Sequence, residues 1–155
     1  MSLEIVRAWL AVHAPEVRLI EAHASTATVL DAAVALGVEP ARIAKTLVLR
    51  VNGYVMLVVT RGDARLDNGK SKAVLGGRPR MLGADETFGL TGHPVGGVCP
   101  FGLATPLPIY CDQLLRAFDI VYPAAGSRNS SVEIAPARLA EITNASWIDV
   151  CTLPA

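Results

Sequence analysis

The chain has 155 residues, of which 52% are hydrophobic and 18% charged, and its 14 basic residues balance its 14 acidic ones. This composition favours one well-packed domain over 1–155 and is too apolar for intrinsic disorder. No stretch approaches the roughly 20 apolar residues of a membrane span, and the N-terminal pattern is charged and amphipathic rather than a secretory signal. We therefore expect a cytoplasmic protein without a membrane partner, and the zero net charge gives no global attraction to DNA or RNA.

The cysteines and histidines form no recognisable metal or redox motif. Cys99, Cys111 and Cys151 are an odd number at wide spacing, so we expect reduced thiols rather than a disulfide framework. The three histidines lack metal-ligand spacing with one another or with cysteine. The sequence predicts neither a metal nor a cofactor.

Helical and extended patterns alternate in the first part of the chain. Apolar residues at helical spacing predict a helix over 2–13, and 17–21 is typical of a short strand. A second helix is expected to begin at an N-cap formed by Ser25 or Thr26 and to end at Gly37.

A β-hairpin is the clearest local prediction. The segments 46–51 and 54–60 are rich in β-branched residues, and Asn52-Gly53 joins them. Both central positions of such a turn need a positive φ, which Asn and Gly tolerate. We expect this hairpin in the middle of the sheet.

Helices and strands are interleaved through the rest of the chain. Residues 91–102, TGHPVGGVCPFG, hold four glycines and two prolines and predict a shaped loop. Several strands adjacent in sequence, with helices between them, indicate a mixed sheet of α+β type. The further predicted elements are helices over 68–75, 84–90, 113–118 and 136–142, and strands over 79–82, 108–111, 120–122, 131–134 and 147–150.

Lys45 is the first candidate for chemistry, because it immediately precedes an apolar strand. If it is partly buried, desolvation lowers the pKa of its ammonium and fixes it as a precise donor. The local context alone also fits a strand-edge lysine that extends its amine into water.

The glycine-rich loop is the second candidate. Closely spaced Gly96 and Gly97 would let backbone N–H groups approach a developing oxyanion or a phosphate, and Gly126-Ser127 is a similar turn with a hydroxyl group. The same glycines also fit a tight connection between two elements. Cys99 lies in this loop, six residues after His93, but we expect a buried, inert thiol.

Basic residues concentrate between Arg61 and Arg80, where six of them accompany two acidic residues. This segment is a candidate for contact with a phosphate backbone. A solvated loop and helix explains the same pattern.

Three motifs taken together resemble the YbaK/ProX family of aminoacyl-tRNA deacylases, which also occurs as the editing insertion of prolyl-tRNA synthetases. They are the helix LDAAVALGV followed by IAKTLVL, the loop TGHPVGGVCPFG, and the turn AAGSRN followed by SVEI. Their order and spacing match over most of the chain.

The resemblance implies a compact fold with a mixed, barrel-like sheet and a pocket between the lysine strand and the glycine loop. Lys45 would be the catalytic lysine, and the residues implied for substrate binding are Thr46, Gly96, Gly97, Pro100, Gly102, Gly126 and Ser127. The partner implied is the acceptor end of an aminoacyl-tRNA, with recruitment by a synthetase or an elongation factor supplying affinity. Attack by water or by the substrate's ribose hydroxyl is the expected chemistry, because no local signature of a protein nucleophile is present.

Two departures from the family pattern leave open which amino acid is removed from the tRNA. Relatives that act on cysteinyl-tRNA carry an acidic residue where this chain has Asn129-Ser130-Ser131, and a bulkier aromatic where it has Ala22 and His23. Alanine, serine, threonine and cysteine are the expected range. The alternatives are a non-catalytic module that binds tRNA or a synthetase, and a hydrolase for a small ester or nucleotide.

Overall fold

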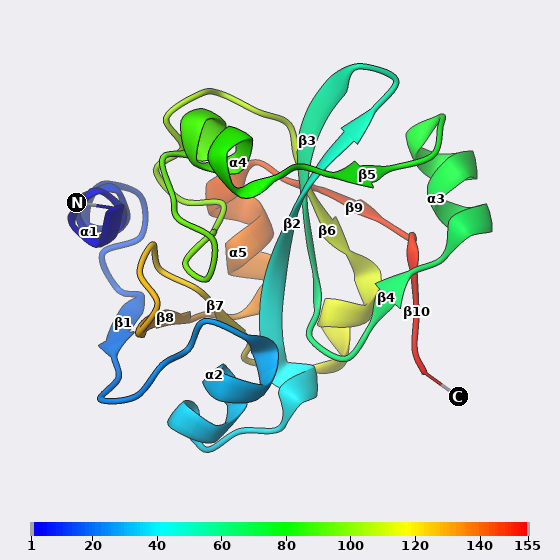
Figure 1. The fold of residues 1–155 in the computed structure, drawn as a ribbon. Coiled ribbons are helices and arrows are strands. Elements are labelled where there is room, and N and C mark those ends of the chain that lie inside the picture. The colour runs from blue at the N-terminus through cyan, green and yellow to red at the C-terminus, as the bar shows by residue number, and fades with distance from the viewer. Residues whose placement is uncertain (1, 155) are drawn as a thin grey trace.

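The computed structural model describes residues 2–154, in which helices surround a mixed β-sheet (Figure 1). The helices are α1 (Ser2–His13), α2 (Val29–Leu36), α3 (Asn68–Leu75), α4 (Ala84–Thr91) and α5 (Pro136–Thr143), with 3-10 turns at Pro40–Arg42 and Gln113–Ala117. The strands are β1 (Arg18–Glu21), β2 (Ile43–Val51), β3 (Tyr54–Arg61), β4 (Arg65–Leu66), β5 (Arg80–Met81), β6 (Ile109–Asp112), β7 (Tyr122–Pro123), β8 (Ser130–Glu133), β9 (Ser146–Ile148) and β10 (Cys151–Thr152).

The predicted hairpin is confirmed as β2 and β3, and it occupies the middle of the sheet. Its turn residues Asn52 and Gly53 have φ values of 49° and 84°, as this turn requires. The main sheet runs β5-β2-β3-β6-β9, and β7 pairs with the first residues of β2. β2 is antiparallel to β3 and β5, whereas β6 is parallel to β3 and β9, so the sheet is mixed.

The main sheet is open rather than closed, so the expectation of a barrel-like sheet is corrected. Within the described residues, β5 and β9 end the strand order and do not pair with each other. Two small separate sheets, β1-β8 and β4-β10, flank the main one. None of the described helices is long and apolar enough to cross a membrane.

The central strand β3 is buried on both faces of the sheet. One core cluster includes Val59 of β3, Leu10 of α1 and Leu139 of α5, and another includes Val58 of β3 and Val150. The consecutive residues from Leu57 to Thr60 are all fully buried. This two-sided burial explains why the strand is almost continuously apolar rather than alternating.

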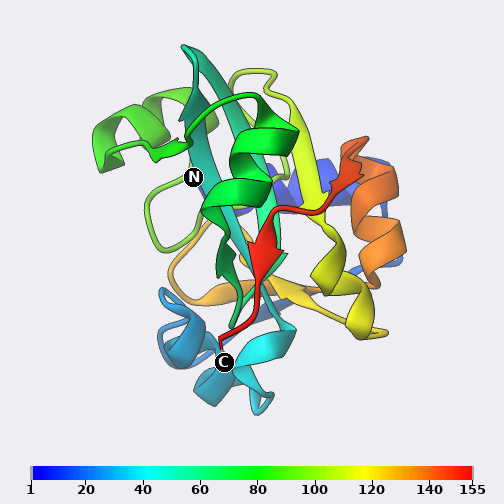
Figure 2. The same ribbon diagram turned by 90° about the vertical axis from the view of Figure 1, so that its right-hand side faces the viewer.

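The C-terminal segment is held against β4 and α3 (Figure 2). The fully buried Asp112 carboxylate accepts hydrogen bonds from the backbone N–H groups of Val150 at 2.9 Å and Cys151 at 3.1 Å. Lys70 of α3 donates to the Cys151 carbonyl at 3.2 Å. The strands β4 and β10 have two residues each, and they were not predicted because they are too short for a periodic signal.

Three local predictions need correction. The N-cap of α2 is Thr28, whose hydroxyl accepts from Asp31 N–H, rather than Ser25 or Thr26. Gln113–Ala117 is a 3-10 helix rather than an α-helix. The final predicted strand ends at Ile148, because the next residues turn towards Asp112.

Candidate functional site

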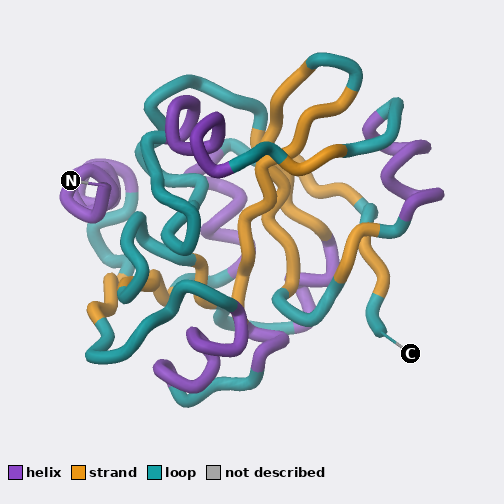
Figure 3. The backbone as a smooth tube through the Cα atoms, viewed as in Figure 1, coloured by secondary structure: helices purple, strands orange, loops and turns teal. Residues whose placement is uncertain are grey.

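A cavity of about 280 Å³ lies beside β2, between the start of α2 and the loop that follows α4. Figure 3 shows this long loop running from α4 to β6. Most of the lining is apolar, and the polar lining consists of the Lys45 side chain and several hydroxyls. The lining residues are Thr26–Val29, Ala32, Ile43–Thr46, Val48, Met81, Leu82, Thr87, Val95, Gly96, Val98, Tyr122, Ala124 and Ser131.

Lys45, the predicted catalytic lysine, is among the residues that line this cavity, and the protein itself binds its amine. Nζ donates to the backbone carbonyl of Gly62 at 3.3 Å and to that of Ala64. Burial lowers the pKa of the Lys45 ammonium, and Cys151 and Asp63 nearby partly oppose that shift. Two backbone acceptors therefore fix the direction of the amine and leave one of its three N–H groups for a ligand.

The turn that holds Lys45 depends on Gly62. A Cβ at this position would lie 2.2 Å from the Pro40 carbonyl oxygen and 2.9 Å from that of Ile43. Only glycine lets the turn approach this closely, and the approach brings its carbonyl within reach of Lys45. Gly62 and Ala64 were not among the predicted site residues, because the only local signal at these positions is that of a short polar turn.

Thr46 also lines the cavity, and its hydroxyl has no partner. Its Oγ1 is buried without a hydrogen bond among the described residues, as is Oγ1 of Thr60, the residue opposite Lys45 on β3. An unsatisfied buried hydroxyl is unfavourable by about 1–3 kcal/mol. Of these two threonines, only Thr46 is among the residues that line the cavity.

The glycine loop divides into two parts. Gly96, at φ 95°, lines the cavity, and neither its N–H nor that of Val98 has a hydrogen-bond partner among residues 2–154. Gly97 lies behind this lining and its N–H donates to the Pro94 carbonyl. The groups that can reach a ligand are thus the N–H groups of Gly96 and Val98 rather than that of Gly97.

Gly97 and Gly126 are brought together, but as packing partners. The Gly126 N–H donates to the Gly97 carbonyl at 2.9 Å, and a Cβ at Gly97 would lie 2.6 Å from the Gly126 carbonyl carbon. Neither residue lines the cavity. Ser127 lies in the same turn, with its hydroxyl bonded to Asn129 and Ser130, and is also outside the lining.

Pro100 and Gly102 lie outside the cavity as well. Both follow the turn of the loop into the protein, where Phe101 is fully buried. Gly102, at φ 61°, faces α1, and a Cβ there would lie 3.0 Å from the Ile5 side chain. The structure therefore brings Lys45, Thr46 and Gly96 to one cavity and leaves the five other predicted binding residues around it.

His93 and Ser2 form a buried pair that the sequence did not reveal. His93 Nε2 lies 2.7 Å from the Phe101 carbonyl oxygen, which can only accept, so Nε2 carries the proton. Nδ1 then accepts from the Ser2 hydroxyl at 2.5 Å. Burial lowers the pKa of His93, which keeps the ring neutral and ties α1 to the glycine loop.

The cysteines do not have the properties of catalytic thiols. Burial raises the pKa of Cys99 to about 12, and its thiol donates weakly to the Phe101 carbonyl at 3.8 Å. Burial likewise raises the pKa of Cys111 and of Cys151 to about 12. None of these thiols is ionised near neutral pH. No cluster of three potential metal ligands occurs within the described part of the chain.

A family model for the aminoacyl-tRNA editing domain matches residues 23–142. The chain belongs to the aminoacyl-tRNA editing domain family. The matched range contains every residue that lines the cavity, from Thr26 to Ser131. The part of the chain that defines this editing domain therefore includes the whole cavity.

Relatives of this editing domain occur both as separate proteins and within synthetases. The chain is 46% identical to the uncharacterized protein YwhH of Bacillus subtilis, over 97% of this chain and 98% of that protein. It is 32% identical to a proposed Cys-tRNA(Pro)/Cys-tRNA(Cys) deacylase, EbsC, of Enterococcus faecalis, over 85% of this chain and 80% of that protein. It is 30% identical to the proline–tRNA ligase of Bacillus licheniformis over 77% of this chain, but only 19% of the ligase.

Solved structures confirm the fold of this editing domain. A crystal structure of a proposed trans-editing enzyme for prolyl-tRNA synthetase superimposes with a TM-score of 0.89 at 34% identity, covering 97% of each chain. The predicted α+β architecture and the resemblance to the YbaK/ProX family are thus both confirmed.

Proposed function

We propose that this editing domain is a hydrolase that removes small amino acids from mischarged tRNA, acting as a separate protein in the cytoplasm. The substrates proposed are alanyl, cysteinyl, seryl or threonyl esters on tRNA(Pro) or a related tRNA. The observation that carries the proposal is Lys45, fixed by two carbonyls at the edge of a mostly apolar cavity.

The cavity fits a small acyl group better than a large one. Its volume of about 280 Å³ is slightly below the roughly 300–1,000 Å³ of sites for drug-sized ligands. Its lining of alanine, valine and threonine side chains suits a small apolar or weakly polar substituent. The hydroxyl-bearing residues of the lining are potential polar contacts for a seryl, threonyl or cysteinyl side chain or for the α-amino group.

In the mechanism we propose, the ester carbonyl lies between Lys45 and the glycine loop. The remaining N–H of the Lys45 amine anchors and polarises the substrate, while the free N–H groups of Gly96 and Val98 face the developing oxyanion. Gly97, Pro100, Gly102, Gly126 and Ser127 support the loop and its neighbouring turn, and we assign them to the site only through this packing.

Water or the ribose hydroxyl of the substrate is the proposed nucleophile. The cysteine thiols remain protonated because burial raises the pKa of each to about 12. The His93 ring is occupied by Ser2 and Phe101 and does not line the cavity. The cavity lining therefore provides no activated protein nucleophile among the described residues.

The test is hydrolysis of a panel of alanyl-, cysteinyl-, seryl- and threonyl-tRNA by the native chain and by Lys45→Ala. We expect release from at least one of them, and a kcat/KM at least about 100-fold lower for Lys45→Ala, as for the loss of one oxyanion donor. Lys70→Ala is the matched control, because Lys70 is paired with Asp149 away from the cavity and its loss leaves kcat/KM within about twofold.

Either of two results would contradict the proposal. Near-normal hydrolysis by Lys45→Ala, with a melting temperature close to that of the native chain, would remove Lys45 from the mechanism. Absence of release from every charged tRNA would favour the non-catalytic module that binds tRNA or a synthetase.

A further inference from the structure

The positive charges of this protein divide into paired and unpaired groups. Seven of the 14 basic residues form ion pairs with acidic side chains, namely Arg7, Arg18, Arg42, Arg50, Arg61, Lys70 and Arg138. Lys45 is held by carbonyls, and Arg116 packs on the Trp147 ring. Within residues 2–154, four other basic side chains have no ion pair, hydrogen bond or cation–π contact: Arg65, Lys72, Arg78 and Arg80.

The ion pairs reduce the number of residues between Arg61 and Arg80 that could contact a phosphate backbone. Arg61 binds Asp63 at 2.7 Å and packs on the Phe118 ring, and Lys70 binds Asp149 at 3.0 Å. Both are neutralised by the protein itself. The positive charges that could still bind a partner are therefore those of the other four basic residues in this stretch.

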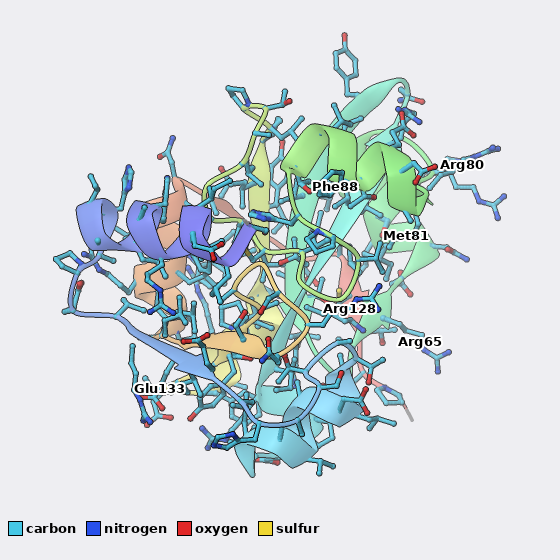
Figure 4. The ribbon with its side chains drawn as sticks, turned by 60° about the vertical axis from the view of Figure 1, so that its left-hand side comes forward. Arg65, Arg80, Met81, Phe88, Arg128 and Glu133 are labelled. Atoms are coloured by element: carbon cyan, nitrogen blue, oxygen red, sulfur yellow. The ribbon has the colours of Figure 1, made fainter. Side chains whose placement is uncertain are left out.

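One exposed arginine contacts the cavity lining, and two others lie towards the same side of the molecule. Arg80 immediately precedes Met81, which lines the cavity. Arg128 packs on the cavity residue Gly96, where a Cβ would meet its Cγ at 3.1 Å, and the only hydrogen-bond partner of its side chain among the described residues is the Val95 carbonyl. Arg65 follows Ala64, whose carbonyl binds Lys45. Figure 4 shows Arg80, Met81, Arg128 and Arg65 towards the same side of the molecule.

Exposed apolar side chains accompany these arginines. Met81 is 62% exposed and Val95 50% exposed, although both line the cavity. Phe88 is 56% exposed and follows the cavity residue Thr87. Exposed aromatic side chains beside unpaired arginines are typical of surfaces that bind single-stranded RNA, because bases stack on the rings and phosphates pair with the guanidinium groups. Phe88 is the aromatic residue of this group, and Met81 and Val95 add apolar contact area.

We infer that Arg65, Arg80 and Arg128, together with Met81 and Phe88, form a rim that binds the single-stranded 3′ end of the aminoacyl-tRNA. This inference rests on the proposed function, which places the ester inside the cavity. The arginines contact the phosphates of the last nucleotides, and Met81 and Phe88 contact the terminal bases. The acidic residues close in sequence to the rim are Asp67, which caps α3, and Asp85 in the first turn of α4. Asp63 and Glu86 are paired with Arg61 and Arg50.

Binding measurements test the rim independently of catalysis. The Kd of uncharged tRNA(Pro) and of a single-stranded oligonucleotide ending in CCA is measured by fluorescence anisotropy at several salt concentrations. We expect Arg65→Ala, Arg80→Ala and Arg128→Ala each to raise both Kd values roughly three- to tenfold. Removal of one phosphate-binding arginine should also reduce the slope of log affinity against log salt by about 0.7.

Arg18→Ala is the matched control. Arg18 is an exposed arginine on β1 whose partner is Glu133, and Figure 4 shows Glu133 on the opposite side from Arg65 and Arg80. Its loss removes the same charge from the chain but should leave both Kd values unchanged. If Arg18→Ala raised the two Kd values as much as the rim variants do, the proposed rim would be wrong. RNA binding would then depend only on the total charge of the chain.

Hydrolysis assays separate the rim from the proposed function. On mischarged tRNA, the rim variants should raise KM more than they do on an aminoacyl-adenosine ester, which lacks the phosphates. Equal effects on the two substrates would overturn the rim while leaving the hydrolase intact. The native chain could also fail to hydrolyse either substrate while the rim variants still bind RNA more weakly. That result would support the rim and contradict the proposed hydrolase activity.

Discussion

The lysine strand β2 and the glycine loop of residues 91–102 contribute to the same cavity in different ways. Four consecutive residues of β2, Ile43–Thr46, line the cavity. The strand runs along the cavity and pairs with β3 on one edge and with β7 on the other. The glycine loop contributes only Val95, Gly96 and Val98, and then turns into the core at Cys99 and Phe101.

The difference shows that glycines in one motif can have separate tasks. Gly96 lines the cavity, whereas Gly97 lies outside the lining and allows the glycine loop to pack closely against the backbone at Gly126. The motif as a whole indicates a functional loop. The assignment of each glycine to ligand contact or to packing depends on neighbours that are distant in sequence, above all Gly126.

The largest effect on stability is expected at Gly97. In Gly97→Ala the new Cβ would lie 2.6 Å from the backbone at Gly126 and Ser127, which cannot move as a side chain can. We expect the free energy of unfolding to fall by about 1–3 kcal/mol, measured by urea denaturation.

Gly89→Ala is the control for this substitution. Gly89 lies inside α4 with no atom within 4 Å of an added Cβ, so alanine should stabilise the chain by roughly 0.5–1 kcal/mol through its helix propensity. An unchanged unfolding energy in Gly97→Ala would contradict the packing role of this glycine.

A smaller effect, of opposite sign, is expected at the two threonines with unpartnered hydroxyls. Thr46→Val and Thr60→Val each replace a buried unsatisfied hydroxyl by a methyl group of similar shape, and each should raise the unfolding energy by about 1 kcal/mol. Only Thr46 lines the cavity, so only Thr46→Val should also lower kcat/KM for mischarged tRNA. Equal kcat/KM values for the two variants would show that the Thr46 hydroxyl does not contact the substrate.

The smallest effect is expected in the pH dependence of stability. Because burial lowers the pKa of His93 below its ordinary 6.5, protonation favours the unfolded chain. This contribution is complete above the unfolded value of about 6.5 and is lost as the pH falls below it. Thermal unfolding between pH 7.5 and 5.5 should therefore show a steeper loss of stability in the native chain than in His93→Gln, and parallel curves would argue against a buried neutral His93.

Elements with strong local signals could be predicted from the sequence. Asn52-Gly53 fixed the hairpin because few other residues tolerate two successive positive φ angles. Helix α3 was predicted over its full range, 68–75, because Gly76-Gly77 indicates where it ends. The structure adds the N-cap, in which the Asp67 side chain accepts from Lys70 N–H. The N-cap of α2 was misplaced because Ser25, Thr26 and Thr28 are all suitable caps, and only the observed bond from Asp31 N–H to Thr28 decides among them.

By itself, the sequence determined the helices and strands with strong local signals, and its resemblance to a known family pointed to a set of candidate residues, of which Lys45, Thr46 and Gly96 lie at one cavity. These features depend on local backbone preferences and on motifs within a short stretch of chain. The tertiary structure alone decided which carbonyls hold the Lys45 amine, that Gly97, Pro100 and Gly102 pack behind the cavity, and which arginines remain unpaired. Burial and charge pairing are set by contacts between residues far apart in sequence, and local patterns carry no information about those contacts.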